Sequence, residues 1–153
     1  MLMPKKTKYR KVQRGRLTGR SKGARTIKFG QYGLVAVEPV WLTARQIEAA
    51  RVAVNRHLKK VGEAFLRVFP DKPVTKKPAE TRMGKGKGNP EIWVCSVKRG
   101  RVILEISGDF TIVDAKKILQ SVAYKLPMKT KFVSREQLQQ QEDAMLAGEV
   151  SNG

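Results

Sequence analysis

The sequence predicts an α+β fold: an antiparallel or mixed sheet sandwich with two helices on one face, preceded by a disordered basic N-terminal arm. Three observations support this prediction. Short apolar runs alternate with Gly and Pro, as in strands that are joined mostly by hairpins. Two longer stretches repeat apolar residues at helical spacing. The chain has 153 residues, of which 41% are hydrophobic, and this is the size of one domain with one core.

The first two strands are expected directly after the arm. Residues 27–29 and 34–37 are short apolar runs, and Gly30 and Gly33 mark the turn between them. Pro39 ends the second run, because proline has no amide hydrogen to continue strand pairing.

The first helix is expected over residues 44–61. Thr43 and Gln46 form a capping-box pattern, in which each side chain can bond the backbone of the other residue. Gly62 is a suitable residue for the C-terminal end of the helix. The apolar face at helical spacing consists of Ile47, Ala50, Val54, Leu58 and Val61.

The middle of the chain is expected to be strand-rich. Residues 64–69 form an apolar run that Pro70 closes, and a long loop rich in Pro and Gly follows, with a short strand near Val74 as a candidate. Residues 91–98 and 101–107 are two apolar runs on either side of Arg99 and Gly100. This arrangement predicts a hairpin.

The second helix is expected to begin near residue 110 and to stop before Pro127. Asp109 and Thr111 are the two candidates for its N-cap. A last strand is expected over residues 128–133. The apolar residues assigned to the helix are Val113, Ile118, Leu119, Val122 and Leu126.

Charge divides the chain into three segments. The 32 Lys and Arg against 13 Asp and Glu give a net charge of +19, which favours a polyanionic partner. Residues 1–30 hold eleven cations and no acid, whereas residues 134–153 hold one cation and four acids. We therefore expect a basic RNA-binding arm at 1–28, a core domain at 29–133 and an acidic tail at 134–153. Within the tail, residues 135–147 are rich in Gln and Glu and weakly helical, so we expect a surface helix or a frayed end there.

The arm contains too few apolar residues to fold alone. A mitochondrial transit peptide is the alternative for such a segment, but its charges do not follow an amphipathic helix. Tyr9 adds an aromatic face on which a base could stack. The cations assigned to RNA binding are Lys5, Lys6, Lys8, Arg10, Lys11, Arg14, Arg16, Arg20 and Lys22, with Arg45, Arg56, Lys59 and Lys60 on the polar face of the first helix.

A basic loop spans residues 76–90 and alternates Gly and Lys at its centre. It matches neither the P-loop nor the dinucleotide-binding spacing. Its glycines let backbone amides approach phosphates, its lysines supply charge, and its arginine can bind a phosphate or stack on a base. A solvated mobile loop is the alternative. The central residues are Arg82, Met83, Gly84, Lys85, Gly86, Lys87 and Gly88.

Catalysis has few candidate residues. His57 is the single histidine and Cys95 the single cysteine, so nucleophile–base pairs and multi-ligand metal sites have little basis. We expect His57 to be a helix-surface residue and Cys95 to be a buried structural residue. No apolar run approaches the roughly 18 residues of a membrane span. The expectation is therefore no catalytic residues, metal, cofactor, small-molecule substrate or membrane partner.

Five segments carry a family resemblance. They are Pro-Lys-Lys-Thr-Lys-Tyr-Arg-Lys (4–11), Leu-Thr-Ala-Arg-Gln-Ile-Glu-Ala-Ala-Arg (42–51), Arg-Val-Phe-Pro-Asp-Lys-Pro (67–73), Arg-Met-Gly-Lys-Gly-Lys-Gly (82–88) and Lys-Leu-Pro-Met-Lys-Thr-Lys-Phe-Val (125–133). In this order they resemble the bacterial ribosomal protein L-sixteen family of the large subunit. Residues 134–153 extend beyond the usual end of the family.

The resemblance implies an α+β sandwich bound to large-subunit ribosomal RNA near the peptidyl-transferase centre, with other ribosomal proteins as neighbours. It implies that the chain helps to order this region during assembly. It also implies that the loop at 82–88 faces tRNA in the A site, with P-site tRNA as a second candidate, and that Arg82 is a candidate for hydroxylation. The expected location is the cytoplasmic ribosome, with a plastid ribosome as the alternative. A free basic RNA chaperone or nucleic-acid-compacting protein is the alternative function.

Overall fold

Two antiparallel sheets and three helices make up the described part of the chain, residues 2–151 of a computed structural model, which confirms the predicted α+β class. Residue 1 of the predicted arm and residues 152–153 of the predicted tail lie outside it. In chain order the elements are β1 (Tyr32–Ala36), β2 (Val40–Thr43), α1 (Ala44–Leu58), β3 (Gly62–Leu66), β4 (Lys72–Lys76), β5 (Asn89–Val97), β6 (Val102–Gly108), α2 (Ile112–Ala123), β7 (Thr130–Ser134) and α3 (Arg135–Ser151).

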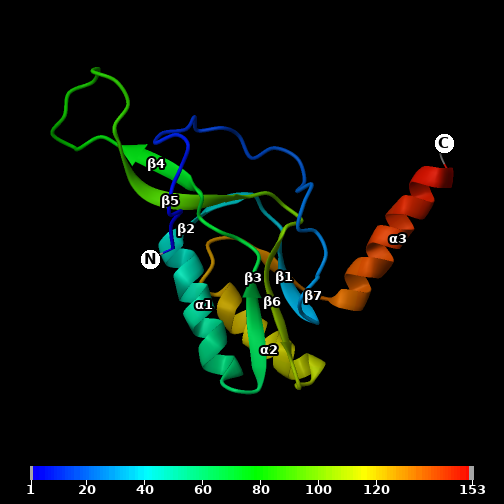
Figure 1. Cartoon of the computed structure of the whole chain (residues 1–153). Helices are drawn as coiled ribbons and strands as arrows, with labels where there is room; N and C mark the ends of the chain where they lie inside the picture. The colour runs from blue at the N-terminus through cyan, green and yellow to red at the C-terminus, as the bar shows by residue number, and fades with distance from the viewer. Residues whose placement is uncertain (1, 152–153) are drawn as a thin grey trace.

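The two sheets divide the strands between them. One sheet has the order β3-β6-β1-β7 and the other the order β2-β5-β4. Helices α1 and α2 pack against each other, and they contact β3 and the β1–β7 pair of the four-stranded sheet (Figure 1). The core lies between these helices and the sheet, and its fully buried side chains include Ile47, Val54, Leu104, Ile106 and Leu119.

The capping box predicted for α1 is present. The Thr43 hydroxyl accepts a hydrogen bond from the Gln46 amide at 3.2 Å, and the Gln46 side-chain oxygen accepts one from the Thr43 amide at 3.0 Å. Four of the five predicted apolar residues are buried, namely Ile47, Ala50, Val54 and Leu58. The start and the buried face of this helix therefore follow from local sequence rules.

The end of α1 was predicted three residues too late. The helix ends at Leu58, Lys59 takes a positive φ of 49°, and Val61 is exposed. Gly62 begins β3 instead of capping the helix, and a Cβ there would lie 2.6 Å from the carbonyl oxygen of Ser107 on the paired strand. The glycine is required by close strand pairing.

The predicted hairpin over 91–107 is wrong. Strand β5 pairs with β2 and β4, whereas β6 pairs with β1 and β3 in the other sheet. The turn between them binds the end of β1, because the Gly100 amide donates to the Ala36 carbonyl at 2.7 Å and the Ala36 amide donates to the Arg101 carbonyl at 2.9 Å. This docking directs β6 into the centre of the four-stranded sheet and away from β5.

The predicted strand at 27–29 is also wrong. These residues form no strand, because the amides of Lys28, Phe29 and Gly30 bind the side chain of Glu105. Strand β2 was not predicted, and the strand expected over 64–69 begins and ends earlier, at Gly62–Leu66.

Of the two candidate caps for α2, Thr111 is the N-cap, and its hydroxyl accepts from the Asp114 amide at 3.3 Å. The assignment of Val113 to the apolar face is wrong, since its side chain is 57% exposed. The helix instead buries Ala115, Leu119 and Val122, which are spaced by one and two turns. Of the two alternatives expected for residues 135–147, the structure has the surface helix, α3, which runs on to Ser151, contacts β7 and extends away from the core (Figure 1).

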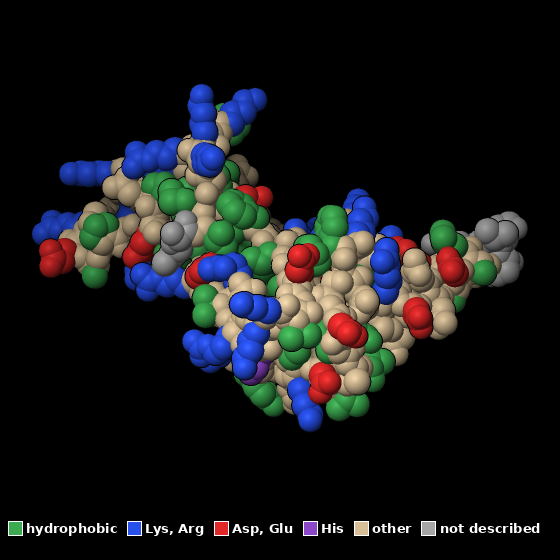
Figure 2. All heavy atoms as spheres, turned by 60° about the horizontal axis from the view of Figure 1, so that its bottom comes forward, with side chains coloured by type: hydrophobic (Ala, Val, Ile, Leu, Met, Phe, Trp, Pro, Cys, Tyr) green, Lys and Arg blue, Asp and Glu red, His purple; other side chains and the backbone are tan. Residues whose placement is uncertain are grey.

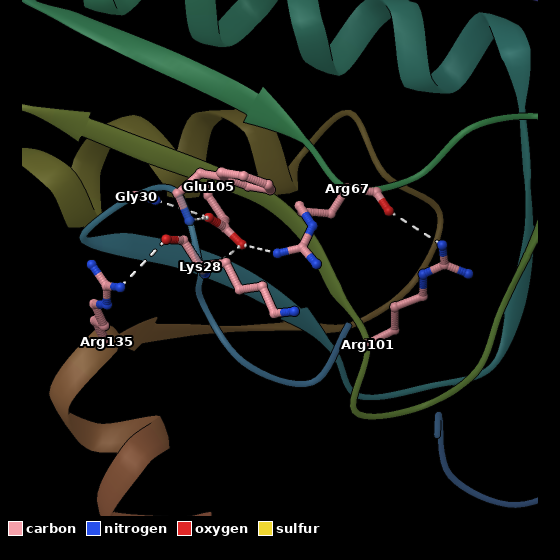
Figure 3. Close-up of polar contacts among 7 residues, drawn as sticks. Lys28, Gly30, Arg67, Arg101, Glu105 and Arg135 are labelled. Carbon is pink, nitrogen blue, oxygen red and sulfur yellow. Dashed lines mark hydrogen bonds and ion pairs between the residues drawn. The ribbon is translucent and has the colours of Figure 1, made fainter. Parts of the chain in front are cut away.

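Glu105 joins three separate parts of the chain, namely β6, residues 28–30 and Arg67. It lies in β6 with a side chain that is fully buried, and its carboxylate accepts hydrogen bonds from the amides of Lys28, Phe29 and Gly30 at 3.2, 2.7 and 2.9 Å (Figure 3). Arg67, directly after β3, donates to it at 2.5 Å. This one carboxylate therefore fixes residues 28–30, which lead into β1, against β6 and the end of β3.

We expect Glu105→Gln to destabilise the fold by about 3–5 kcal/mol, the usual cost of breaking a buried ion pair. The introduced amide group would face backbone donors and leave at least one of them unpaired. Urea unfolding measures the effect. Glu48→Gln is the matched control, because the pair of Glu48 with Arg51 on α1 is a surface pair, and its loss should leave stability near that of the wild type. Equal effects of the two changes would contradict the role assigned to Glu105.

Candidate nucleic-acid interface

The arm runs along the surface of the core as an extended segment. Within the described residues it contains no helix and no strand, apart from one bridge between Arg20 and Arg99. The predicted arm cations are exposed, except Lys11, which is half-buried. Tyr9 is also exposed, with the Lys8 ammonium 5.5 Å from the centre of its ring. The structure therefore presents these side chains to solvent, where a polyanion could reach them.

The arm and the basic loop lie side by side. The Lys11 ammonium donates to the Lys87 carbonyl at 2.8 Å, and the Lys87 ammonium donates in return to the carbonyl of Val12. Arg10 donates to the side chain of Asn89 at 3.5 Å. We call residues 8–16 and 82–89 together the arm–loop surface. Its two halves are about 70 residues apart in the sequence, but they form one surface in the folded chain.

Trp41 and Lys72 support the arm at this point, and neither was predicted from the sequence. The Lys72 ammonium lies 4.6 Å from the centre of the Trp41 ring and donates to the carbonyl of Arg14. The Arg14 guanidinium lies 5.6 Å from the centre of the same ring. No local pattern marks these residues, because β2 and β4 are brought together only by their pairing with β5.

The loop between β4 and β5 projects away from both sheets (Figure 1). Gly84, Lys85 and Gly86 all have positive φ, of 103°, 59° and 89°, so the glycines at the tip serve a left-handed turn. Met83 is 99% exposed. The Lys77 ammonium donates to the Gly84 carbonyl at 2.5 Å and closes the loop on itself. Arg82 and Lys85 remain exposed and directed to solvent.

The cations predicted on α1 form two groups. Arg45 lies at the start of the helix, in a groove that it shares with Leu2 of the arm. Arg56, Lys59 and Lys60 lie at the opposite end, about 20 Å away at a rise of about 1.5 Å per residue. The structure therefore places Arg45 near the arm and gives the other three a separate position.

Positive and negative side chains are unevenly distributed over the molecule, although both kinds occur at each end (Figure 2). Lys and Arg side chains project from the end that carries the loop, and Asp and Glu side chains follow α3 at the opposite end (Figure 2). Among the described arm residues, only Arg25 has an acidic partner, Glu142 of α3, at 4.0 Å. The remaining described arm cations have no acidic partner among residues 2–148.

Neither reactive residue type lies in a site suited to catalysis. His57 is exposed on α1, and Cys95 is buried in β5, where burial raises the pKa of its thiol and so disfavours the reactive thiolate. Between residues 2 and 151, no group of three or more His, Cys, Asp or Glu could hold a metal ion. In the same residues no helix is both long and apolar enough to cross a membrane.

A folded α+β domain whose basic arm and loop converge on one surface is typical of nucleic-acid-binding proteins. The comparisons with known proteins are more specific. Residues 4–133 match the family described as ribosomal protein L16p/L10e. The "Large ribosomal subunit protein uL16" of Heliobacterium modesticaldum is 54% identical over 138 residues, covering 90% of this chain and 95% of that protein. The chain belongs to the ribosomal protein L16p/L10e family, which confirms the resemblance seen in the sequence.

The backbone hydrogen bonds between the arm and the core lie at the C-terminal end of the arm, whereas Leu2 at its start packs against the core by its side chain. The Ser21 amide donates to the Arg99 carbonyl at 3.0 Å, the Val102 amide donates to the Ala24 carbonyl at 2.7 Å, and Glu105 holds residues 28–30. Earlier in the arm, the contacts with the loop are exposed. Exposed contacts of this kind add little stability.

We therefore expect the amides of residues 2–19 to exchange rapidly in the free chain and those of residues 28–30 to exchange slowly. After binding to large-subunit ribosomal RNA, residues 2–19 should become protected. Hydrogen exchange read by mass spectrometry measures both states, and α2 provides the segment whose protection should not change. Equal protection of 2–19 and 28–30 in the free chain would contradict the disorder predicted for the arm.

Proposed function

We propose that this chain, a structural constituent of the large ribosomal subunit, binds large-subunit ribosomal RNA through its arm and presents the basic loop to tRNA in the A site. The observation that carries the proposal is the convergence of arm and loop on one surface that has no acidic partner within the described chain. Phosphate is the matching ligand, because Lys and Arg exchange small counterions for it on binding.

The arm suits folded RNA better than a DNA groove. It is extended, and its glycines make its backbone flexible, so it can follow an irregular path between RNA helices and become ordered there. By linking RNA segments to the core, it would help to order the peptidyl-transferase and A-site region during assembly. Neighbouring ribosomal proteins would share this environment, and the ribosome would be the cytoplasmic one.

The loop suits a ligand that binds and dissociates repeatedly. It projects from the sheets, its tip side chains contribute nothing to the core, and Arg82 and Lys85 keep free donors. P-site tRNA is the second candidate for contact. Arg82 is exposed, so it is accessible to the hydroxylation that the family resemblance implies. No small molecule is needed as a substrate for this role.

A free RNA chaperone is the alternative function, and stoichiometry distinguishes the two. A structural constituent should sediment with large subunits at about one copy each after a moderate-salt wash. A chaperone should dissociate and vary in copy number.

We expect removal of residues 2–19 to reduce the salt dependence of binding to large-subunit ribosomal RNA. The deletion removes seven of the predicted arm cations and spares the anchored residues from Ser21 onward. The slope of log affinity against log salt should become shallower by about 0.7–0.9 for each phosphate that the arm no longer neutralises. Filter binding over a salt series measures it. An unchanged slope would show that the arm cations stay solvated in the complex.

We expect Arg82→Gln with Lys85→Gln to weaken tRNA binding and leave folding unchanged. Both side chains are exposed, so the change in stability should stay within about 0.5 kcal/mol. A charge-assisted hydrogen bond is worth about 1.5–3 kcal/mol, so removal of each such bond should reduce A-site tRNA affinity about tenfold or more.

The measurement is tRNA binding to large subunits reconstituted to equal occupancy. Lys116→Gln with Lys117→Gln on α2 is the control, since it removes the same charge from exposed positions outside the loop. Normal tRNA binding by the loop variant would leave the loop as a ribosomal RNA contact or a solvated tip.

A further inference from the structure

The segment Arg67–Pro73 is one of those that carry the family resemblance, and only its Lys72 contacts the arm–loop surface through a hydrogen bond. It borders a groove of about 790 Å³ between the arm, the end of β3 and the start of β6. This volume is within the usual range of ligand sites. The lining residues used below are Val12, Phe29, Phe69, Asp71, Lys72 and Arg101.

Phe29 presents an open aromatic face to this groove. Its ring centre lies 5.7 Å from that of Phe65 and 5.2 Å from the Arg67 guanidinium. Phe65 and Arg67 are two residues apart in extended chain, so their side chains point to the same side and cover one face of the Phe29 ring. Phe29 is still 60% exposed, so a large part of its ring remains open to solvent and available for stacking. Phe69 continues the same alternation and is 45% exposed.

The position of Phe29 is fixed by its backbone. Its amide is one of the three that bind the Glu105 carboxylate. An exposed phenylalanine on a fixed backbone gives up little freedom when a second flat ring covers it, so Phe29 is preorganised for stacking.

The groove also holds an unused donor. The Nε atom of Arg101 is buried and has no hydrogen-bond partner in the described part of the chain. The guanidinium is oriented by the Arg67 carbonyl, which accepts from Nη2 at 3.2 Å. Lys72 adds a second cation, and Asp71 adds an acceptor that suits the amino group of a base. Nε itself is shielded from solvent, so the groove offers a ligand the positive charge of the Arg101 guanidinium beside that of Lys72.

We propose that this groove binds one unstacked nucleotide of ribosomal RNA. The base lies on the exposed part of the Phe29 ring, and a phosphate or base oxygen accepts from Arg101. We favour RNA over a peptide as the ligand, because the groove borders Val12 of the basic arm. An RNA strand bound to the arm would therefore pass the groove. The inference rests on the proposed ribosomal RNA binding and adds stacking to it.

The test uses the full-length chain and large-subunit ribosomal RNA. Phe29→Leu should lower affinity about 5- to 150-fold, the range for removal of one base–aromatic stack. The slope of log affinity against log salt should stay unchanged, because the substitution leaves every cationic side chain in place. Tyr124→Leu is the matched control, as this aromatic residue is 77% exposed at the far end of α2, and its affinity should equal that of the wild type.

Ultraviolet crosslinking of the wild-type chain gives a readout that does not depend on how the variant folds. Mass spectrometry should find a nucleotide adduct on the peptides that contain Phe29 or Phe69. Wild-type affinity of a folded Phe29→Leu variant, or adducts confined to the arm and loop, would overturn the inference and leave the proposed function intact. Crosslinking of the groove to a neighbouring protein in intact subunits would also overturn it. A wild-type chain that does not bind the RNA at all would instead refute the proposed function.

Discussion

The carboxylate of Glu105 is the interaction on which the rest of the structure depends. A fully buried charge is costly unless donors surround it, and here three backbone amides and Arg67 do so. The same bonds fix where the arm ends and β1 begins, and they place Phe29 on the surface beside Arg67. Stability and the position of a candidate binding residue therefore have the same origin.

The positive charge of the chain, in contrast, does not stabilise the fold. Nearly all arm cations lie in solvent without an acidic partner in residues 2–148, so they repel one another and contribute nothing to the core. The reciprocal lysine–carbonyl bonds between the arm and the loop hold these charges close together. Such an arrangement is favourable only when a polyanion neutralises it. The fold therefore positions the arm–loop surface, and the ligand would supply the stabilising charge.

Local rules predicted some elements well and strand pairing poorly. The start of α1 follows from Thr43 and Gln46 alone, because a capping box involves only four consecutive residues. The pairing partner of β5 does not follow from the local sequence, because the apolar patterns of residues 91–98 and 101–107 fit a hairpin and a placement in two sheets equally well. Docking of the turn onto Ala36 decided between them. Residues 27–29 were misassigned for a similar reason, since their amides bind a side chain more than 70 residues away.

The sequence by itself determined the class of fold, the separation into basic arm, core and acidic tail, and the family. These properties depend on composition, periodicity and contiguous motifs, all of which are local. Only the tertiary structure decided that the arm and the loop share one surface, that Trp41 and Lys72 support the arm, and that Phe29 borders a groove with Arg101. Each of these depends on strands from distant parts of the chain meeting in one register, and pairing of this kind leaves no local signal in the sequence.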